Sequence, residues 1–119
     1  MIHNFRELQV WKKSMEITKL IYQLTKNFPS YEQYALASQM QRAAVSIPSN
    51  IAEGAGRATN KELCHFLSFS LGSAYELETE LTLAYELGYI GNSEYGEVNQ
   101  SLVEIQKMLY SLIDKNKEV

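Results

Sequence analysis

The stretch RAAVSIPSNIAEGAGR, residues 42–57, places a proline inside an otherwise helical pattern. Apolar or small positions recur with helical spacing on both sides of it: Leu36, Met40, Ala43, Ile47, Asn50 and Gly54. Because a helix that stopped and restarted would usually shift its phase, this spacing predicts one continuous helix, kinked at Pro48. Pro48 cannot donate to the carbonyl of Ala44, which costs about 3 kcal/mol, so other groups must compensate.

Two kinds of compensation are expected around the proline. The side chains of Ser46, Ser49 and Asn50 can bond freed backbone groups locally. If the chain turns back near residue 58, residues 43–48 face roughly residues 68–74, where Gly72 interrupts the next helix at a cost of about 1 kcal/mol. We therefore expect Ala43, Ala44 and Gly72 to mark a close approach of two helices. The structural motif singled out on this basis comprises Pro48, Asn50, Glu53, Gly54, Gly72, Ser73 and Glu76.

Outside this stretch too, apolar residues recur with the spacing of an α-helix along most of the chain. The expected helices cover about 5–27, 30–54, 59–88 and 92 or 93 to 115, with no alternating pattern typical of strands. Asn4, Ser30 and Thr59 are expected N-caps, each followed three residues later by Glu or Gln. Gly88 is placed to end the third helix. Short connections favour antiparallel neighbours, so the prediction is a single all-α domain, residues 1–119, folded as an up-down-up-down antiparallel four-helix bundle.

The apolar residues exceed what one small bundle needs. The first helix has two stripes, one with Leu8, Trp11, Met15 and Tyr22 and the other with Val10, Ile17, Ile21, Leu24 and Phe28. The third helix carries Phe69, Leu83 and Leu87 beside its regular seam. A larger monomer core is one explanation, and a subunit interface through Phe69, Leu83 and Leu87 is the one we favour.

Composition narrows the functional class. The net charge is −3 and Cys64 is the single cysteine, so no intramolecular disulfide can form, and no segment reads as a membrane span or secretion signal. These features favour a cytoplasmic protein. Residues 1–28 carry five basic and two acidic side chains, a net charge of +3, whereas residues 59–88 carry one basic and five acidic ones, a net charge of −4. These segments are either solvated helix faces or complementary packing surfaces within or between subunits.

Motifs for catalysis or metal binding are weak. Glu62 and His65 have the Glu-x-x-His spacing of metal-binding bundles, but the other histidine is His3 and no second motif exists. Glu62 is better explained as the capping partner of Thr59. Glu76 and Glu80 share a face, for which an ion pair such as Arg42 with Glu76 is the simpler interpretation. We expect no cofactor and no enzymatic activity; a metal- or small-molecule-binding bundle enzyme is the alternative.

Nucleic acid is a second possible partner besides another copy of the chain. If the chain binds RNA, contacts to phosphates are expected from basic residues in the first helix or at the turn between the second and third helices. These residues are Arg6, Lys12, Lys13, Lys19, Lys26, Arg57 and Lys61. The acidic total weighs against a strong general affinity.

Three blocks carry a family resemblance: FRELQVWKKSMEI near the start, SIPSNIAEG in the middle, and LSFSLGSAYELETEL followed by LGYI. In this order they resemble the four-helix-bundle proteins named for the 23S rRNA intervening sequence. The resemblance implies a bacterial, cytoplasmic, non-enzymatic bundle that assembles as a homopentamer. The family is also similar to the basic, nucleic-acid-binding accessory proteins of diversity-generating retroelements, from which this acidic chain departs.

Overall fold

The computed structural model describes residues 4–117. Its four α-helices are α1 (Gln9–Thr25), α2 (Leu36–Ala55), α3 (Asn60–Glu86) and α4 (Asn92–Asn116). Two short 3-10 turns, η1 (Phe5–Glu7) and η2 (Ser30–Glu32), precede α1 and α2. The predicted all-α fold with four helices is confirmed, and residues 4–117 contain no strand.

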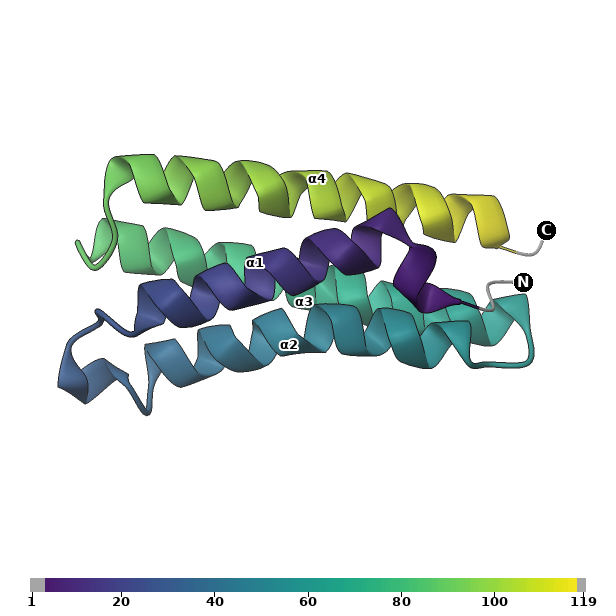
Figure 1. Ribbon diagram of the computed structural model, residues 1–119, viewed down its shortest axis with the longest axis horizontal. Helices are drawn as coiled ribbons and strands as arrows, with labels where there is room; N and C mark the ends of the chain where they lie inside the picture. Colours follow the sequence, from purple (N-terminus) through teal and green to yellow (C-terminus); the bar gives the residue numbers. More distant parts are fainter. Residues whose placement is uncertain (1–3, 118–119) are drawn as a thin grey trace.

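Each helix packs against two others. α2 contacts α1 and α3, and α4 contacts α3 and α1, so α1 and α3 occupy diagonal positions. The chain colours in Figure 1 run in opposite directions along successive helices, from purple in α1 to yellow in α4. No helix within the described residues is long and apolar enough to cross a membrane.

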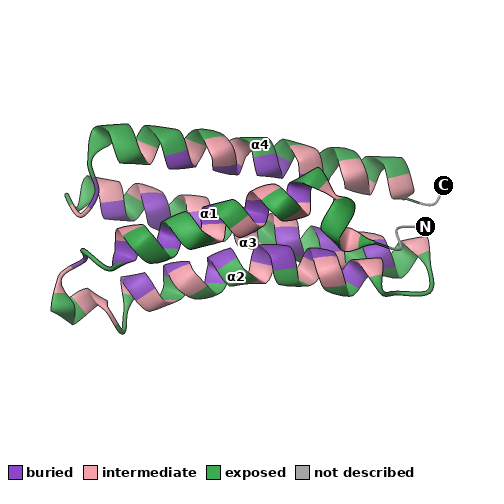
Figure 2. Ribbon diagram, viewed as in Figure 1, coloured by how far each residue is buried: buried purple, intermediate pink, exposed green. Residues whose placement is uncertain are grey.

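The core lies along the seams expected from helical spacing. α3 buries every predicted seam position: Leu63, Leu67, Ser70, Ala74, Leu77, Leu81 and Ala84. α4 buries Val98, Leu102, Ile105 and Leu109, while Tyr95 and Leu112 flank the core. Figure 2 shows this burial as purple patches on the sides of the helices that face one another. The near-heptad spacing therefore located the core of both helices correctly.

The structure decides between the two stripes of α1. Val10, Ile17 and Ile21 are buried in the core, and Phe28 extends this stripe beyond the helix. On the other stripe, Tyr22 is 45% exposed and Trp11 is only partly buried. The first stripe therefore lies in the core of the monomer. In the second, Leu8 and Trp11 pack against the edge of the core and Tyr22 faces outward.

Helix α1 begins later than predicted. The expected helix from residue 5 is a 3-10 turn, η1, in which Asn4 Oδ1 accepts a hydrogen bond from the backbone N–H of Arg6 at 3.2 Å. α1 then starts at Gln9. The intervening bend lets the Phe5 ring pack edge-on against Trp11, at 5.2 Å between ring centroids.

Helix α2 begins at Leu36 and not at Ser30. Gln33, the expected capping partner of Ser30, instead donates from Nε2 to the carbonyls of Thr25 and Phe28, at 2.9 and 3.0 Å. The Thr25 carbonyl belongs to the last turn of α1 and the Phe28 carbonyl to the connection that follows, so Gln33 satisfies acceptors at and just beyond the end of α1. Glu32 Oε1 accepts the backbone N–H of Leu36 at 3.4 Å, at the start of α2.

Two other helix ends follow the predicted local chemistry. Thr59 Oγ1 accepts the backbone N–H of Glu62 at 3.1 Å and caps α3. Gly88 has φ +83, which glycine adopts without a Cβ clash. The backbone N–H groups of Gly88 and Tyr89 donate to the carbonyls of Tyr85 and Ala84, which closes the end of α3.

Helix α4 has a different cap from the one expected. The N-cap is Gly91, whereas Asn92 or Ser93 was predicted. The carboxylate of Glu94 accepts the backbone N–H of Gly91 at 3.2 Å. This carboxylate also stabilises the positive end of the helix dipole.

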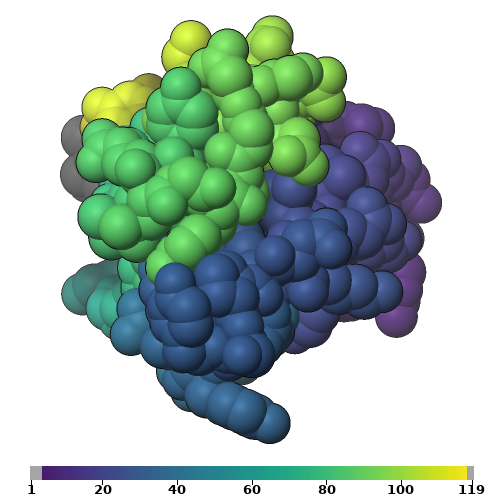
Figure 3. Space-filling view, turned by 90° about the vertical axis from the view of Figure 1, so that its left-hand side faces the viewer, coloured from purple at the N-terminus to yellow at the C-terminus, as the bar shows by residue number. Residues whose placement is uncertain are grey.

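At one end of the bundle, the α1–α2 connection meets the α3–α4 connection. Figure 3 views this end, with the blue and green segments in contact. Tyr89 from the green segment donates its hydroxyl to Glu32 Oε2 at 2.7 Å. Its ring packs against Phe28 at 5.3 Å between centroids. These contacts hold the two connections together.

Candidate interaction surface

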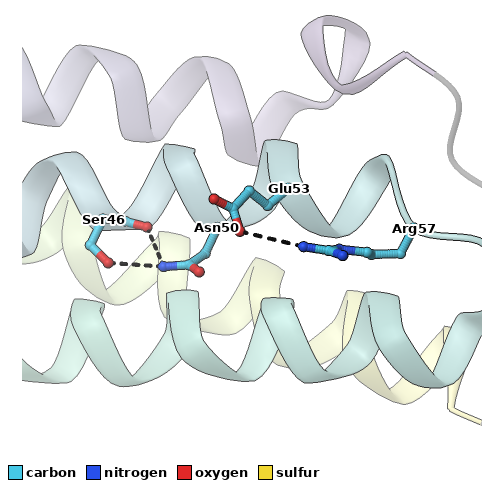
Figure 4. A network of polar contacts seen from close by, with 4 residues as sticks. All are labelled: Ser46, Asn50, Glu53 and Arg57. Carbon is cyan, nitrogen blue, oxygen red and sulfur yellow. Dashed lines mark hydrogen bonds and ion pairs between the residues drawn. The ribbon is translucent and has the colours of Figure 1, made fainter.

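The sequence motif around Pro48 forms a polar strip along the α2–α3 seam. Asn50 donates from Nδ2 to the carbonyl and to the hydroxyl oxygen of Ser46, at 2.8 and 2.9 Å (Figure 4). From α3, Ser73 donates to Ser46 Oγ at 2.9 Å, and Ser70 donates to the carbonyl of Ile47 at 2.9 Å. The predicted pairing of residues 43–48 with 68–74 is thus confirmed by contacts.

Pro48 lies inside a continuous helix, since α2 runs unbroken from Leu36 to Ala55. The carbonyl of Ala44 lacks the donor that Pro48 cannot supply, and it accepts the hydroxyl of Thr18 from α1 at 3.1 Å. The compensation therefore crosses between helices. Sequence reasoning placed it within α2, and missed Thr18 because no local signal links residues 26 positions apart.

Gly54, and not Gly72, marks the close approach of α2 and α3. A Cβ on Gly54 would lie 3.0 Å from Phe66 Cβ and 3.2 Å from the carbonyl oxygen of Leu63. A Cβ on Gly72 would meet nothing within 4 Å. The prediction that Gly72 marks a close approach to α2 is wrong, because Gly72 lies on the exposed side of α3, away from the seam that Ser70 and Ser73 occupy.

Beyond Asn50, the motif ends on charged and aromatic side chains. Arg57 Nη2 lies 3.9 Å from Glu53 Oε2 (Figure 4), and its guanidinium stacks 4.4 Å from the Phe66 ring centroid. The nearby His65 ring lies 4.5 Å from the centroid of Phe69. Arg57 therefore holds protein partners in this structure, whereas its predicted role was contact with nucleic acid.

A pair of carboxyl groups lies further along α3. Glu80 is 6% exposed, and its Oε1 has no hydrogen-bond partner. Burial, together with the neighbouring carboxyl of Glu76, raises the pKa of Glu80 to about 7, while the positive charge of Arg42 opposes this shift. The expected ion pair between Arg42 and Glu76 is absent from the ion pairs of the described residues. Arg42 therefore acts on Glu80 through its charge and forms no ion pair with Glu76 among the described residues.

The three residues assigned to an interface lie outside the monomer core. Phe69 is 50% exposed, Leu83 46% and Leu87 57%. Their positions on α3 fall on the same exposed side as Glu76. They are exposed apolar side chains along one side of α3 and its C-cap, with Glu76 between Phe69 and Leu83, and their role in assembly stays a prediction.

The basic residues predicted to contact nucleic acid do not form one patch. Lys13 pairs with Glu104 of α4 at 2.8 Å, and the Arg6 guanidinium lies over the Phe5 ring at 4.8 Å. Lys61 is exposed near the start of α3. Three others are exposed at intervals of seven along α1 and its C-cap, and we call Lys12, Lys19 and Lys26 the lysine row.

The structure offers little support for metal chemistry. Within residues 4–117, no group of three or more His, Cys, Asp or Glu side chains is placed to hold a metal ion. Glu62 caps α3 through Thr59, and the Cys64 thiol donates to the carbonyl of Ile113 at 3.6 Å. His3 lies outside the described residues.

Comparison of the chain with known proteins finds a matching family and a similar solved structure. The family model for the 23S rRNA-intervening sequence protein matches residues 6–111. Among solved structures, the chain is similar to a protein of unknown function from the S23 ribosomal protein family of Bacteroides thetaiotaomicron VPI-5482. The identity is 29%, over 88% of this chain and 95% of that chain, with a TM-score of 0.82. No curated protein matches the sequence.

Proposed function

The chain belongs to the 23S rRNA-intervening sequence protein family, and we propose that it is a non-enzymatic protein that assembles with copies of itself into an interaction scaffold. The observation that carries this proposal is the exposure of Phe69, Leu83 and Leu87 on one helix. Large apolar side chains gathered on one face of a soluble protein usually mark a contact surface.

The polar groups beside this surface support a structural role. Ser46, Asn50, Ser70 and Ser73 bond to backbone carbonyls or to one another. The hydrogen bonds of Ser70 and Ser73 join α3 to α2, and those of Asn50 stay within α2. The interhelical pair fixes the position of α3 and of its exposed residues. A rigid surface loses little conformational entropy on association, which favours binding.

The number of copies is proposed from the family resemblance, which points to a homopentamer. RNA is kept as the alternative partner, because the lysine row is exposed and makes none of the ion pairs found within residues 4–117. Evenly spaced lysines on one helix face could contact successive phosphates. A non-enzymatic scaffold of this kind could therefore bind RNA as well as other copies of the chain.

The test of self-assembly is the mass of the purified protein by light scattering at micromolar concentration. We expect a mass of several chains, five if the pentamer is correct, and a mass of one chain would overturn the proposal. Phe69→Glu and Leu83→Glu are expected to reduce the mass while circular dichroism stays helical, since burying a new carboxylate at a contact is costly.

Tyr110→Glu is the matched control for this experiment. Tyr110 is 65% exposed and lies on α4, so its replacement introduces the same charge at an exposed aromatic position on a different helix. We expect it to leave the mass unchanged. If Leu83→Glu unfolds the protein instead, Leu83 stabilises the monomer and the division of the surfaces is wrong.

A further inference from the structure

An exposed row on α3 has helical spacing of its own. Phe69, Gly72, Glu76, Thr79 and Leu83 are all exposed and follow one another at intervals of three and four. We call these five residues the outer α3 row. Such spacing places side chains along one line of a helix, as in the seam between two packed helices. The core seam of α3 is a different set of residues, so this row has no partner helix among the described residues.

Gly72 is the second of the five positions in the outer α3 row, and no contact within the chain explains a glycine there. Glycine inside a helix is less favourable than alanine, because it loses more backbone entropy on folding. At Gly54 the nearness of Phe66 and Leu63 accounts for that cost, whereas a Cβ at Gly72 would meet no atom within 4 Å. A helix that approached α3 closely from outside would require a residue without a side chain at this point.

The acidic side chains beside Gly72 favour a partner helix that carries positive charge. Glu76 lies in the row, and the buried Glu80 follows four residues later with its Oε1 unpartnered. Arg42 is the charged group of α2 that acts on this pair. The Glu76 carboxylate is exposed and makes none of the ion pairs found within residues 4–117, so a cationic side chain of another copy can pair with it.

The lysine row of α1 has the matching length and charge. It spans residues 12–26 and the outer α3 row spans residues 69–83, and both correspond to about 21 Å of helix at about 1.5 Å per residue. Apolar side chains accompany the lysines, including Tyr22, which is 45% exposed. This combination mirrors the apolar and acidic character of the outer α3 row.

We propose that α1 of a second copy crosses the outer α3 row at Gly72 and sets its lysine row beside Glu76 and Glu80. This inference rests on the proposed self-assembly and specifies which two surfaces meet. The two surfaces differ, so each copy offers one of each and every contact repeats the same pairing.

The first test places a large side chain at the proposed crossing point. Gly72→Leu fills open space in the monomer, so the fold remains intact while the close approach of the second helix is blocked. We expect the dissociation constant of the assembly to rise about tenfold or more, measured by light scattering over a dilution series. Gly96→Leu is the matched control, because a Cβ on Gly96 of α4 also meets nothing within 4 Å, and it should leave assembly unchanged.

The second test exchanges charge across the contact. Lys19→Glu and Glu76→Lys should each weaken assembly about tenfold, because each places like charges together. The double variant K19E/E76K should restore assembly, since the new carboxylate on α1 of one copy then faces the new ammonium group on α3 of the next. Lys107→Glu, an exposed position on α4, should have no effect.

The outcomes separate this inference from the proposal on which it rests. If the wild-type protein is a single chain, both are wrong. If it assembles and Gly72→Leu leaves the mass unchanged, self-assembly stands and the crossing at Gly72 is overturned. If the Lys19 variant leaves assembly intact and instead weakens binding of a structured RNA at low salt, the lysine row serves RNA and the pairing of α1 with α3 is overturned.

Discussion

At the scale of single residues, Pro48 is tolerated because a side chain from another helix donates to the carbonyl that the proline leaves without a backbone donor. The hydroxyl of Thr18 lies 3.1 Å from the carbonyl of Ala44 and 2.7 Å from that of Ser14. One hydrogen is shared between these two acceptors. The proline is also buried, so it contributes packing as well as its cost to the helix.

Thr18→Val is expected to destabilise the protein by about 1 kcal/mol, because it leaves the Ala44 carbonyl without a donor. In a Pro48→Ala background the loss should be smaller, since the new backbone N–H can bond the same carbonyl. Urea unfolding of the four proteins in this cycle measures the difference. Thr79→Val serves as control, because the Thr79 hydroxyl bonds only within its own helix, to Tyr75. Equal losses in both backgrounds would contradict the compensation.

Glu80 gives stability a dependence on pH. Its pKa in the folded protein is about 7, above the ordinary value of 4.5, with burial as the main cause. The folded protein thus holds a proton that the unfolded chain releases. The stability contributed by this proton is fully present below pH 4.5 and is lost as pH rises through about 7.

We expect the free energy of unfolding to fall between about pH 5 and pH 8 by roughly 1–3 kcal/mol more in the wild type than in Glu80→Gln. Glutamine keeps the shape of the side chain and cannot ionise. Urea unfolding at a series of pH values measures both proteins. Glu97→Gln, at an exposed site on α4, should follow the wild type. Parallel curves for wild type and Glu80→Gln would show that Glu80 keeps an ordinary pKa.

At the scale of helices, the α2–α3 pair contains two glycines, one closely packed and the other with open space around it. Gly54 faces α3, where the Phe66 side chain and the Leu63 backbone leave no room for a methyl group. Gly72 faces outward with open space around it. The same substitution should therefore have opposite effects on the stability of the folded monomer.

Gly54→Ala is expected to destabilise by about 1–3 kcal/mol, because backbone atoms of α3 must move. Gly72→Ala should stabilise by up to about 1 kcal/mol, through helix propensity alone. Urea unfolding in the Leu83→Glu background measures both without a contribution from assembly. If Gly54→Ala stabilises as Gly72→Ala does, α2 and α3 are not in close contact at this point.

At the scale of the whole molecule, the two proposed contact surfaces lie on helices that do not pack against each other within one chain. α1 and α3 are diagonal. The outer edge of α1 shares a shallow hollow with α2, lined by Trp11, Met15 and Val45. On α3, Glu80 lies near Arg42 of α2. A contact between two different surfaces repeats from copy to copy and closes a ring when the rotation between neighbours divides a full turn. We expect such a ring from the family resemblance, and light scattering would show it as a fixed mass that does not grow with concentration.

The sequence by itself determined what depends on neighbours a few residues apart. Helical spacing located the buried seam of α3 from Leu63 to Ala84. The side chain of Thr59 and the conformational freedom of Gly88 fixed where that helix begins and ends. These features were predictable because hydrogen bonds and periodicity within a single helix set them.

Only the tertiary structure decided how each helix is turned toward the others. The stripe of α1 that contains Val10, Ile17 and Ile21 is the one buried in the core. Thr18 of α1 donates its hydroxyl to the carbonyl of Ala44 in α2. Gly54, and not Gly72, lies where α2 and α3 approach closely. The tertiary structure also directed Gln33 to the end of α1, which delays the start of α2. Helical spacing defines the faces of a helix, but which neighbour covers each face depends on the packing of all four helices at once.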